Sequence, residues 1–250
     1  MKRIMVVIVT LLIVLLSLGT TVSAEEDLKV VASTSWVGAI AEAAGARNVT
    51  VLAPIELRHP PEYDFRPVDI QRAVQADLIL WGGYEGFIRN LVTAAKIPDD
   101  KVIRVVTNNA PPVLAESAAS LAAILGTTEQ FREWEKELQA LAEEIQTAAA
   151  AQNVSEKKVI VQAHQQRFAE WVGYNVVGVF GPAELTPVRL AEILKMEPEA
   201  IIDNWHSAQG EPIKGTGRTY HSLINFPGPA QTVSILDVIR YNAKQLGLLD

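Results

Sequence analysis

The sequence contains no cysteine. This absence excludes disulfide bonds, thiolate metal sites, cysteine nucleophiles and a lipid-modified cysteine at a mature N-terminus, so the protein is not expected to be a lipoprotein. Positive charge is also scarce, because 22 Lys and Arg face 29 Asp and Glu and the formal net charge is −7. A nucleic-acid partner is therefore not expected, since no surplus of cations is present to neutralise phosphates. The 250 residues are 49% hydrophobic and 20% charged, which is typical of a globular protein that can bury a sizeable core.

Long hydrophobic runs are missing except at the N-terminus. There Lys2 and Arg3 precede an uncharged apolar run over residues 4–18, and the small residues Val22-Ser23-Ala24 come next. This pattern predicts a secretory signal peptide over residues 1–24. The run is shorter than the roughly 20 residues that a membrane-spanning helix needs, although an uncleaved N-terminal anchor is an alternative. In both cases we expect the folded part to be periplasmic or extracellular.

Short β-rich runs alternate with helical segments in both halves of the remaining chain. Such alternation indicates βαβ units and a mostly parallel sheet, and it predicts an α/β fold of two lobes, each with a parallel sheet flanked by helices. The predicted strands are 29–33, 49–53, 78–81, 102–106, 159–162, 175–180, 200–203 and 222–225. The predicted helices are 36–44, 67–75, 86–95, 165–172, 187–196 and 235–246.

The middle of the chain, residues 113–152, has no strand pattern. Thr127 and Gln130 have the spacing of a capping box, and five apolar residues at steps of three and four then predict one helix face that reaches about Ala151. These five residues are Phe131, Trp134, Leu138, Leu141 and Ile145, and we interpret them as core contacts. We therefore expect one long connecting helix between the lobes. The predicted organisation is a signal peptide (1–24), an N-terminal lobe (25–112), a connecting helical segment (113–157) and a C-terminal lobe (158–250).

Three of the four histidines follow predicted strands. They are His59, His164 and His206. Ligands of parallel α/β sheets bind beyond the carboxyl ends of the strands, and three imidazoles suit zinc. The residues therefore predict a metal site made of these three histidines with Asp203 or Asn225, although a single loop histidine is more often simply solvated or hydrogen bonded.

Several stretches resemble the extracytoplasmic zinc- or manganese-binding proteins of metal ABC importers. Residues 61–70, PEYDFRPVDI, are similar to the family's H-x-Y-E-P-x-P-x-D-I motif, and ADLILWGG follows at 76–83. Residues 159–179, which include His164, resemble the second-lobe histidine motif, and residues 232–246 resemble the C-terminal helix. The resemblance covers essentially the whole mature chain. It implies two lobes, a rigid connecting helix, a metal in the cleft between the lobes and an ABC permease as partner.

The ligand positions depart from the family's pattern. Pro61 stands where the family has its first histidine, and His59 lies two residues earlier. Residues 109–113 contain no histidine where the family has its second one. His164 matches the second-lobe histidine only with a displacement of about two residues, and Asn225 replaces the late carboxylate of many members. The resemblance therefore implies the scaffold more strongly than the metal ligands.

These observations predict a monomeric solute-binding protein, not an enzyme, that captures a divalent metal and delivers it to an ABC permease. Nitrogen ligands favour Zn²⁺ over Mn²⁺. One alternative is the same scaffold binding a metal chelate or a small organic solute. Another is a secreted metallohydrolase that uses His164, His206 and Asp203, and a third is an adhesin or sensor domain without a solute. The sequence contains no G-x-S-x-G, P-loop or H-E-x-x-H motif.

Overall fold

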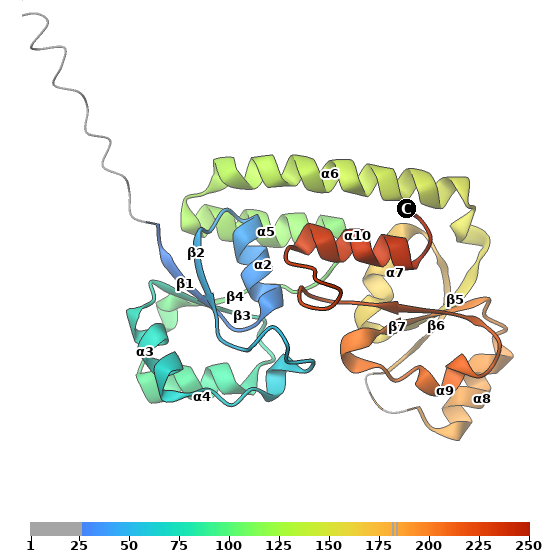
Figure 1. The fold of residues 1–250 in the computed structure, drawn as a ribbon, viewed down its shortest axis with the longest axis horizontal. Helices are drawn as coiled ribbons and strands as arrows, with labels where there is room; N and C mark the ends of the chain where they lie inside the picture. The colour runs from blue at the N-terminus through green and yellow to red at the C-terminus, as the bar shows by residue number, and fades with distance from the viewer. Residues whose placement is uncertain (1–26, 182, 184) are drawn as a thin grey trace, which may run out of the picture.

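The computed structural model describes residues 27–181, 183 and 185–250, so the predicted signal peptide lies outside the described residues. The described chain forms two four-stranded sheets, which lie side by side (Figure 1). All strand pairs in both sheets are parallel. The predicted fold class, two α/β lobes that each hold a parallel sheet flanked by helices, is confirmed.

The first sheet has the order β2-β1-β3-β4 and consists of β1 (Lys29–Ala32), β2 (Asn48–Val51), β3 (Leu78–Trp81) and β4 (Val102–Arg104). The second sheet has the order β6-β5-β7-β8 and consists of β5 (Lys158–Gln162), β6 (Asn175–Phe180), β7 (Ala200–Asn204) and β8 (Thr219–Leu223).

Side chains of the central strands alternate between two cores in each lobe, as the two-residue period of a strand requires. In β1, Val30 belongs to a core shared with α2 (Ser35–Ala43), whereas Val31 belongs to a separate core with α3 (Pro67–Gln75) and α4 (Gly86–Ala95). Helices therefore cover both faces of the first sheet (Figure 1).

The C-terminal lobe repeats this arrangement. Val161 of β5 joins the same core as Val30, together with α7 (Gln166–Val172) and α10 (Ile235–Gln245). Ile160 instead packs with Ile193 of α8 (Pro187–Lys195) and Ile213 of α9 (Glu211–Lys214). One hydrophobic core therefore extends through both lobes, and each lobe has a smaller core on its other face.

The connection between the lobes is a pair of helices, α5 (Pro111–Leu125) and α6 (Thr128–Ala151). The long helix was predicted, but α5 was not. Pro111 occupies the first turn of α5, where a missing N–H costs no hydrogen bond, and Gly126 ends this helix with a left-handed φ of 73°. The predicted capping box at Thr127 is wrong, because the Thr127 hydroxyl donates to the carbonyl of Ala44 at the end of α2.

Helix α6 runs over both lobes (Figure 1) and contacts α5, α7 and α10. Helix α10 also contacts α2 of the N-terminal lobe. Hydrogen bonds join the lobes as well: Ser35 Oγ donates to the carbonyl of Pro227 at 2.9 Å, and Asn109 Nδ2 donates to that of Ile224 at 3.2 Å. The two lobes are therefore joined both by helix packing and by hydrogen bonds.

The last strand differs from its prediction. It begins at Thr219 instead of residue 222, so His221 lies within β8, where its Nδ1 is 2.7 Å from the carbonyl oxygen of Gln245. Strand β8 is an edge strand, paired only with β7, and its polar residues gave no apolar run to recognise.

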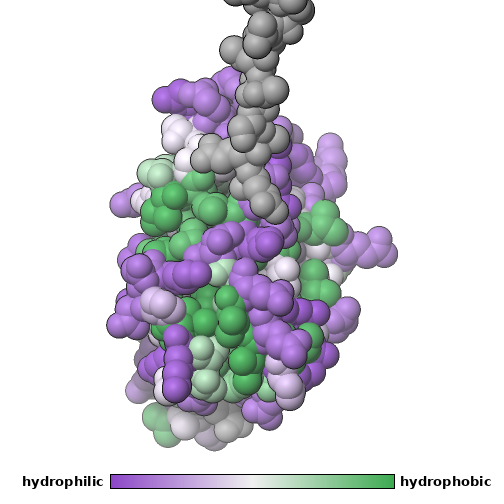
Figure 2. Space-filling view, turned by 90° about the vertical axis from the view of Figure 1, so that its left-hand side faces the viewer, coloured by the Kyte–Doolittle hydropathy of each residue, from purple (hydrophilic) through white to green (hydrophobic). Residues whose placement is uncertain are grey.

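The molecular surface mixes polar and apolar residues. Figure 2 shows the end of the molecule formed by the N-terminal lobe, where groups of hydrophobic residues lie between hydrophilic ones. Val68 and Val74 of α3 are among the exposed large apolar residues of the chain. Within the described ranges, no helix combines the length and the hydropathy needed to cross a membrane.

Candidate functional site

A cleft of about 1000 Å³ lies between the lobes. Its lining comes from the segments that follow seven strands, β1 to β5, β7 and β8, so the carboxyl ends of both parallel sheets face it. This is the place where open α/β sheets bind their ligands. The lining side chains used below are Trp36, Arg58, His59, Tyr84, His164, Arg167, Glu170, Asn204, His206, Asn225 and Phe226.

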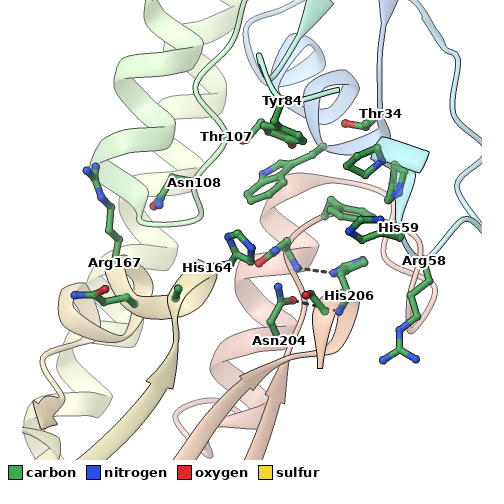
Figure 3. A pocket seen from close by; sticks show the side chains of 18 of the residues that line it. Thr34, Arg58, His59, Tyr84, Thr107, Asn108, His164, Arg167, Asn204 and His206 are labelled. Atoms are coloured by element: carbon green, nitrogen blue, oxygen red, sulfur yellow. Dashed lines mark hydrogen bonds between the residues drawn. The ribbon is translucent and has the colours of Figure 1, made fainter. Parts of the chain in front are cut away.

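Two of the predicted histidines face the cleft from opposite lobes (Figure 3). His59 precedes the short helix η1 (Pro60–Glu62); its side chain is half exposed and its Nδ1 lies 3.0 Å from a carboxylate oxygen of Glu62. His164 lies in η4 (Ala163–Gln165), directly after β5. Burial, and then the charge of His59, lower the pKa of His164 below its ordinary value. Its imidazole is therefore neutral at pH 7, the form that binds metals.

The third histidine, His206, is in a different chemical state. Its Nδ1 accepts a hydrogen bond from the backbone N–H of Asn225 at 3.1 Å, so the ring proton is on Nε2 (Figure 3). Burial, and then the charge of Arg58, lower the pKa of His206 to about 3. A metal-bound imidazole normally donates from the nitrogen that does not bind the metal. Because that nitrogen accepts here, His206 presents an N–H group rather than a lone pair.

Asp203 does not line the cleft. Its carboxylate accepts hydrogen bonds from the backbone N–H groups of Asn204 and Gly210, each at 2.8 Å, and from the hydroxyl of Tyr220. Neighbouring strand residues point to opposite faces, and at the end of β7 it is Asn204 that reaches the cleft.

Asn225 lines the cleft, but its Oδ1 accepts from Gln165 Nε2 at 2.6 Å. In the described part of the chain, no three His, Asp or Glu side chains are grouped so that they could hold one metal ion. Of the five residues predicted as metal ligands, His59, His164, His206 and Asn225 line the cleft, and Asp203 does not. Strand-end positions locate side chains at the cleft, but they do not determine where each one points.

Two arginines of the cleft lining were not predicted. The guanidinium of Arg58 donates to the carbonyl of Trp205 and lies 4.8 Å from the centre of the Trp205 ring. Arg167 comes from α7 on the other wall (Figure 3). Glu170 is the one acidic residue in the described lining, so formal positive charge exceeds negative charge there. Arg58 directly precedes His59 in the polar loop after β2. This position in the sequence is the one feature that could have indicated that Arg58 lines the cleft.

Comparison with known proteins identifies solved structures that share this fold. No protein-family model matches the sequence, and no curated protein matches it. Solved structures do match. The laminin-binding protein Lbp of Streptococcus pyogenes is 17% identical, with a TM-score of 0.68 over 90% of this chain and 99% of that one. FpvC of Pseudomonas aeruginosa, in complex with Ni²⁺, is 15% identical, with a TM-score of 0.72 over 88% and 96% of the two chains.

Zn(II)-bound AdcAII of Streptococcus pneumoniae, in a mutant form, is 17% identical, with a TM-score of 0.62 over 88% of this chain and 99% of that one. The chain has the fold of metal-binding solute-binding proteins. The resemblance predicted from the sequence motifs is thus confirmed at the level of the fold. In this fold, the cleft described above lies between the two lobes.

The buried neutral state of His206 predicts acid sensitivity. The unfolded chain binds a proton near pH 6.5, whereas the folded chain binds it only near pH 3, so stability is full above pH 6.5 and falls as the pH drops through this window. The expected loss attributable to His206 is about 2 kcal/mol between pH 7.5 and pH 5. Urea unfolding at both pH values measures it. His206→Phe, which cannot titrate, should lose less stability than the wild type over this interval; an equal loss would contradict the assignment.

Proposed function

We propose that this protein is an extracytoplasmic solute-binding protein that captures a divalent metal in the interlobe cleft and delivers it to an ABC permease. The observation that carries the proposal is the cleft of about 1000 Å³, lined from both lobes, with His59 on one wall and His164 on the other. FpvC and AdcAII, which share the fold, are described with Ni²⁺ and Zn(II).

The cargo we propose is a complexed metal rather than a bare ion. Two imidazoles are fewer than the four ligands that zinc takes in most protein sites, so the remaining positions would be filled by ligands that the metal brings with it. The cleft has the size of a small-molecule site, about 300–1,000 Å³, which exceeds the needs of a single ion. Zn²⁺ is the preferred metal because imidazole nitrogen favours it over Mn²⁺.

Binding is better supported than catalysis. The metallohydrolase alternative needs His164, His206 and Asp203 around one metal. Asp203 is hydrogen bonded away from the cleft, and His206 carries its proton on Nε2. A hydrolytic zinc site with three protein ligands and an open position therefore has no counterpart among these residues.

The cellular setting follows from the predicted secretion signal. We propose that the protein is a monomer outside the cytoplasm. We further propose that it is not attached through a lipidated cysteine, because the sequence has no cysteine. The closely joined lobes favour modest closure around the cargo over a wide hinge motion.

Metal content tests the proposal. The stripped protein is re-equilibrated with equimolar Zn²⁺, Mn²⁺, Fe²⁺ and Ni²⁺, with and without citrate as a chelator, and the retained metal is measured by mass spectrometry. We expect about one equivalent of one metal, retained best with citrate, and an affinity at least tenfold lower in His164→Ala because one of two imidazole ligands is lost.

His221→Ala is the matched control, because it removes a histidine that lies in β8 and not in the cleft lining. It should keep the wild-type metal affinity. Retention of no metal by the wild type, or equal titration isotherms for wild type and His164→Ala, would refute the proposed metal role.

A further inference from the structure

Three buried N–H donors at the cleft have no partner among the described residues: Trp36 Nε1, Asn204 Nδ2 and His206 Nε2. Their residues line the cleft and are only 8%, 1% and 6% exposed, respectively. Burying a donor without an acceptor is costly, and folded proteins keep few such groups. Three of them at one cleft indicate that a ligand supplies the acceptors.

Trp36 and His206 flank Phe226, and Asn204 is hydrogen bonded to the backbone of His206, so we call these three residues the donor cluster. The Trp36 ring lies 5.9 Å from the Phe226 ring, and the His206 ring lies 3.5 Å from it, measured between centroids. Asn204 Oδ1 accepts from the backbone N–H of His206 at 3.2 Å, which directs the amide nitrogen of Asn204 elsewhere. Trp36 comes from α2 of the N-terminal lobe, whereas Asn204 and His206 come from the end of β7 and the turn after it. Both lobes thus contribute to the cluster.

The chemistry of the cluster selects its ligand. All three groups donate, and none of them offers a free lone pair to a cation; His206 in particular uses its Nδ1 lone pair on Asn225. Among the described residues, the two other unpartnered buried side-chain atoms are Asn109 Oδ1 and Gln165 Oε1, which are acceptors and whose residues do not line the cleft. A carboxylate or phosphate group, which only accepts hydrogen bonds, matches these three N–H donors.

The charge of the surroundings agrees with an anionic ligand. Arg58 lies next to the cluster, stacked on Trp205, whose ring is 5.0 Å from that of His206. Arg167 adds a second positive charge from the opposite wall, and Glu170 is the single acid in the described lining. A bare divalent cation would meet this surplus of positive charge with only one carboxylate in the described lining to offset it.

We propose that Trp36, Asn204 and His206 form an oxyanion subsite that binds a carboxylate or phosphate group of the cargo. This proposal rests on the proposed function, because it takes the cleft as the place where the cargo binds. Figure 3 shows Asn204, His206 and His164 on the C-terminal lobe, with His59 across the pocket. The subsite holds the anionic part of a metal complex while His59 and His164 complete the coordination of its metal, or it holds a free oxyanion.

Isothermal titration calorimetry on the full-length protein tests the subsite with four probes: citrate alone, inorganic phosphate alone, Zn²⁺ alone and zinc citrate. We expect at least one oxyanion probe to bind and Trp36→Phe to weaken that binding at least tenfold, because it removes one N–H and keeps an aromatic ring. Trp171→Phe is the matched control, since it makes the same change outside the cleft lining, and should bind as the wild type does. His206→Phe should repeat the loss.

The four probes distinguish a metal complex from a free oxyanion as the ligand. They also test the oxyanion subsite separately from the proposed metal role. Tighter binding of zinc citrate than of citrate identifies a metal complex as cargo, and equal binding identifies a free oxyanion. Failure of citrate, phosphate and zinc citrate to bind overturns the subsite, even where Zn²⁺ alone binds through His164 and the metal role stands. Oxyanion binding that Trp36→Phe does not weaken also overturns it. Oxyanion binding that depends on Trp36, with no metal retained, supports the subsite and refutes the metal role.

Discussion

Ile145→Ala in α6 is expected to lower the free energy of unfolding by about 2–5 kcal/mol, because it opens a cavity in a packed core. Ile145 is fully buried, in the core that contains Val30 of the first sheet and Val161 of the second. For a chain of this size, the melting temperature should fall by about 4–20 °C. Because the core is shared, both lobes should lose stability together.

Thermal melting followed by circular dichroism measures this effect. Glu144→Ala is the matched control, since Glu144 is the exposed neighbour of Ile145 on the same helix, and it should melt within about 2 °C of the wild type because exposed substitutions change stability little. Two separate transitions, of which only one shifts in Ile145→Ala, would contradict a core common to both lobes.

Glu85→Ala is expected to destabilise the protein by about 2–4 kcal/mol through lost hydrogen bonds. The Glu85 carboxylate is fully buried and accepts from Ser33 Oγ at 2.6 Å, from the N–H of Gly82 at 3.0 Å and from that of Tyr84 at 3.2 Å. Its removal leaves these donors without acceptors. It also releases the turn that holds Tyr84 in the cleft lining, and Gly83 within that turn has a left-handed φ of 93°.

Chemical denaturation and cargo titration together measure the effect of Glu85. Glu133→Ala, which removes an exposed carboxylate of α6, is the control and should leave both unchanged. Glu85→Gln keeps one acceptor oxygen and should lose less stability than Glu85→Ala. Unchanged stability in Glu85→Ala would show that the turn does not depend on the carboxylate.

The central strands could be predicted from the sequence because burial gives them continuous apolar runs. The central strand Leu78–Trp81 has the predicted bounds, and so does the edge strand Asn175–Phe180, which also forms an apolar run. The bounds of edge strand β8 were predicted less accurately, since Thr219–Leu223 pairs on one side only and carries polar residues. Helix α5 lacked a clear apolar stripe, because Pro111–Leu125 is rich in alanine and apolar on several faces.

The position of the three histidines at the cleft could also be predicted. His59, His164 and His206 line the cleft because parallel strands bring their carboxyl ends together. What these side chains can do there could not be predicted. Asp203 faces away because strand residues alternate, and Arg58 joins the lining through the carbonyl of Trp205, a contact between distant parts of the chain.

The sequence by itself determined the alternation of strands and helices, the buried stripe of α6 and the exclusion of cysteine chemistry, because each depends on local spacing or composition. Only the tertiary structure decided which polar groups at the cleft have partners. The pairing of β7 with β8 brings the backbone N–H of Asn225 to His206, 19 residues earlier in the chain. That hydrogen bond puts the ring proton on Nε2 and makes His206 a donor. It depends on the tertiary structure, because only the folded backbone brings together two groups that are distant in the sequence.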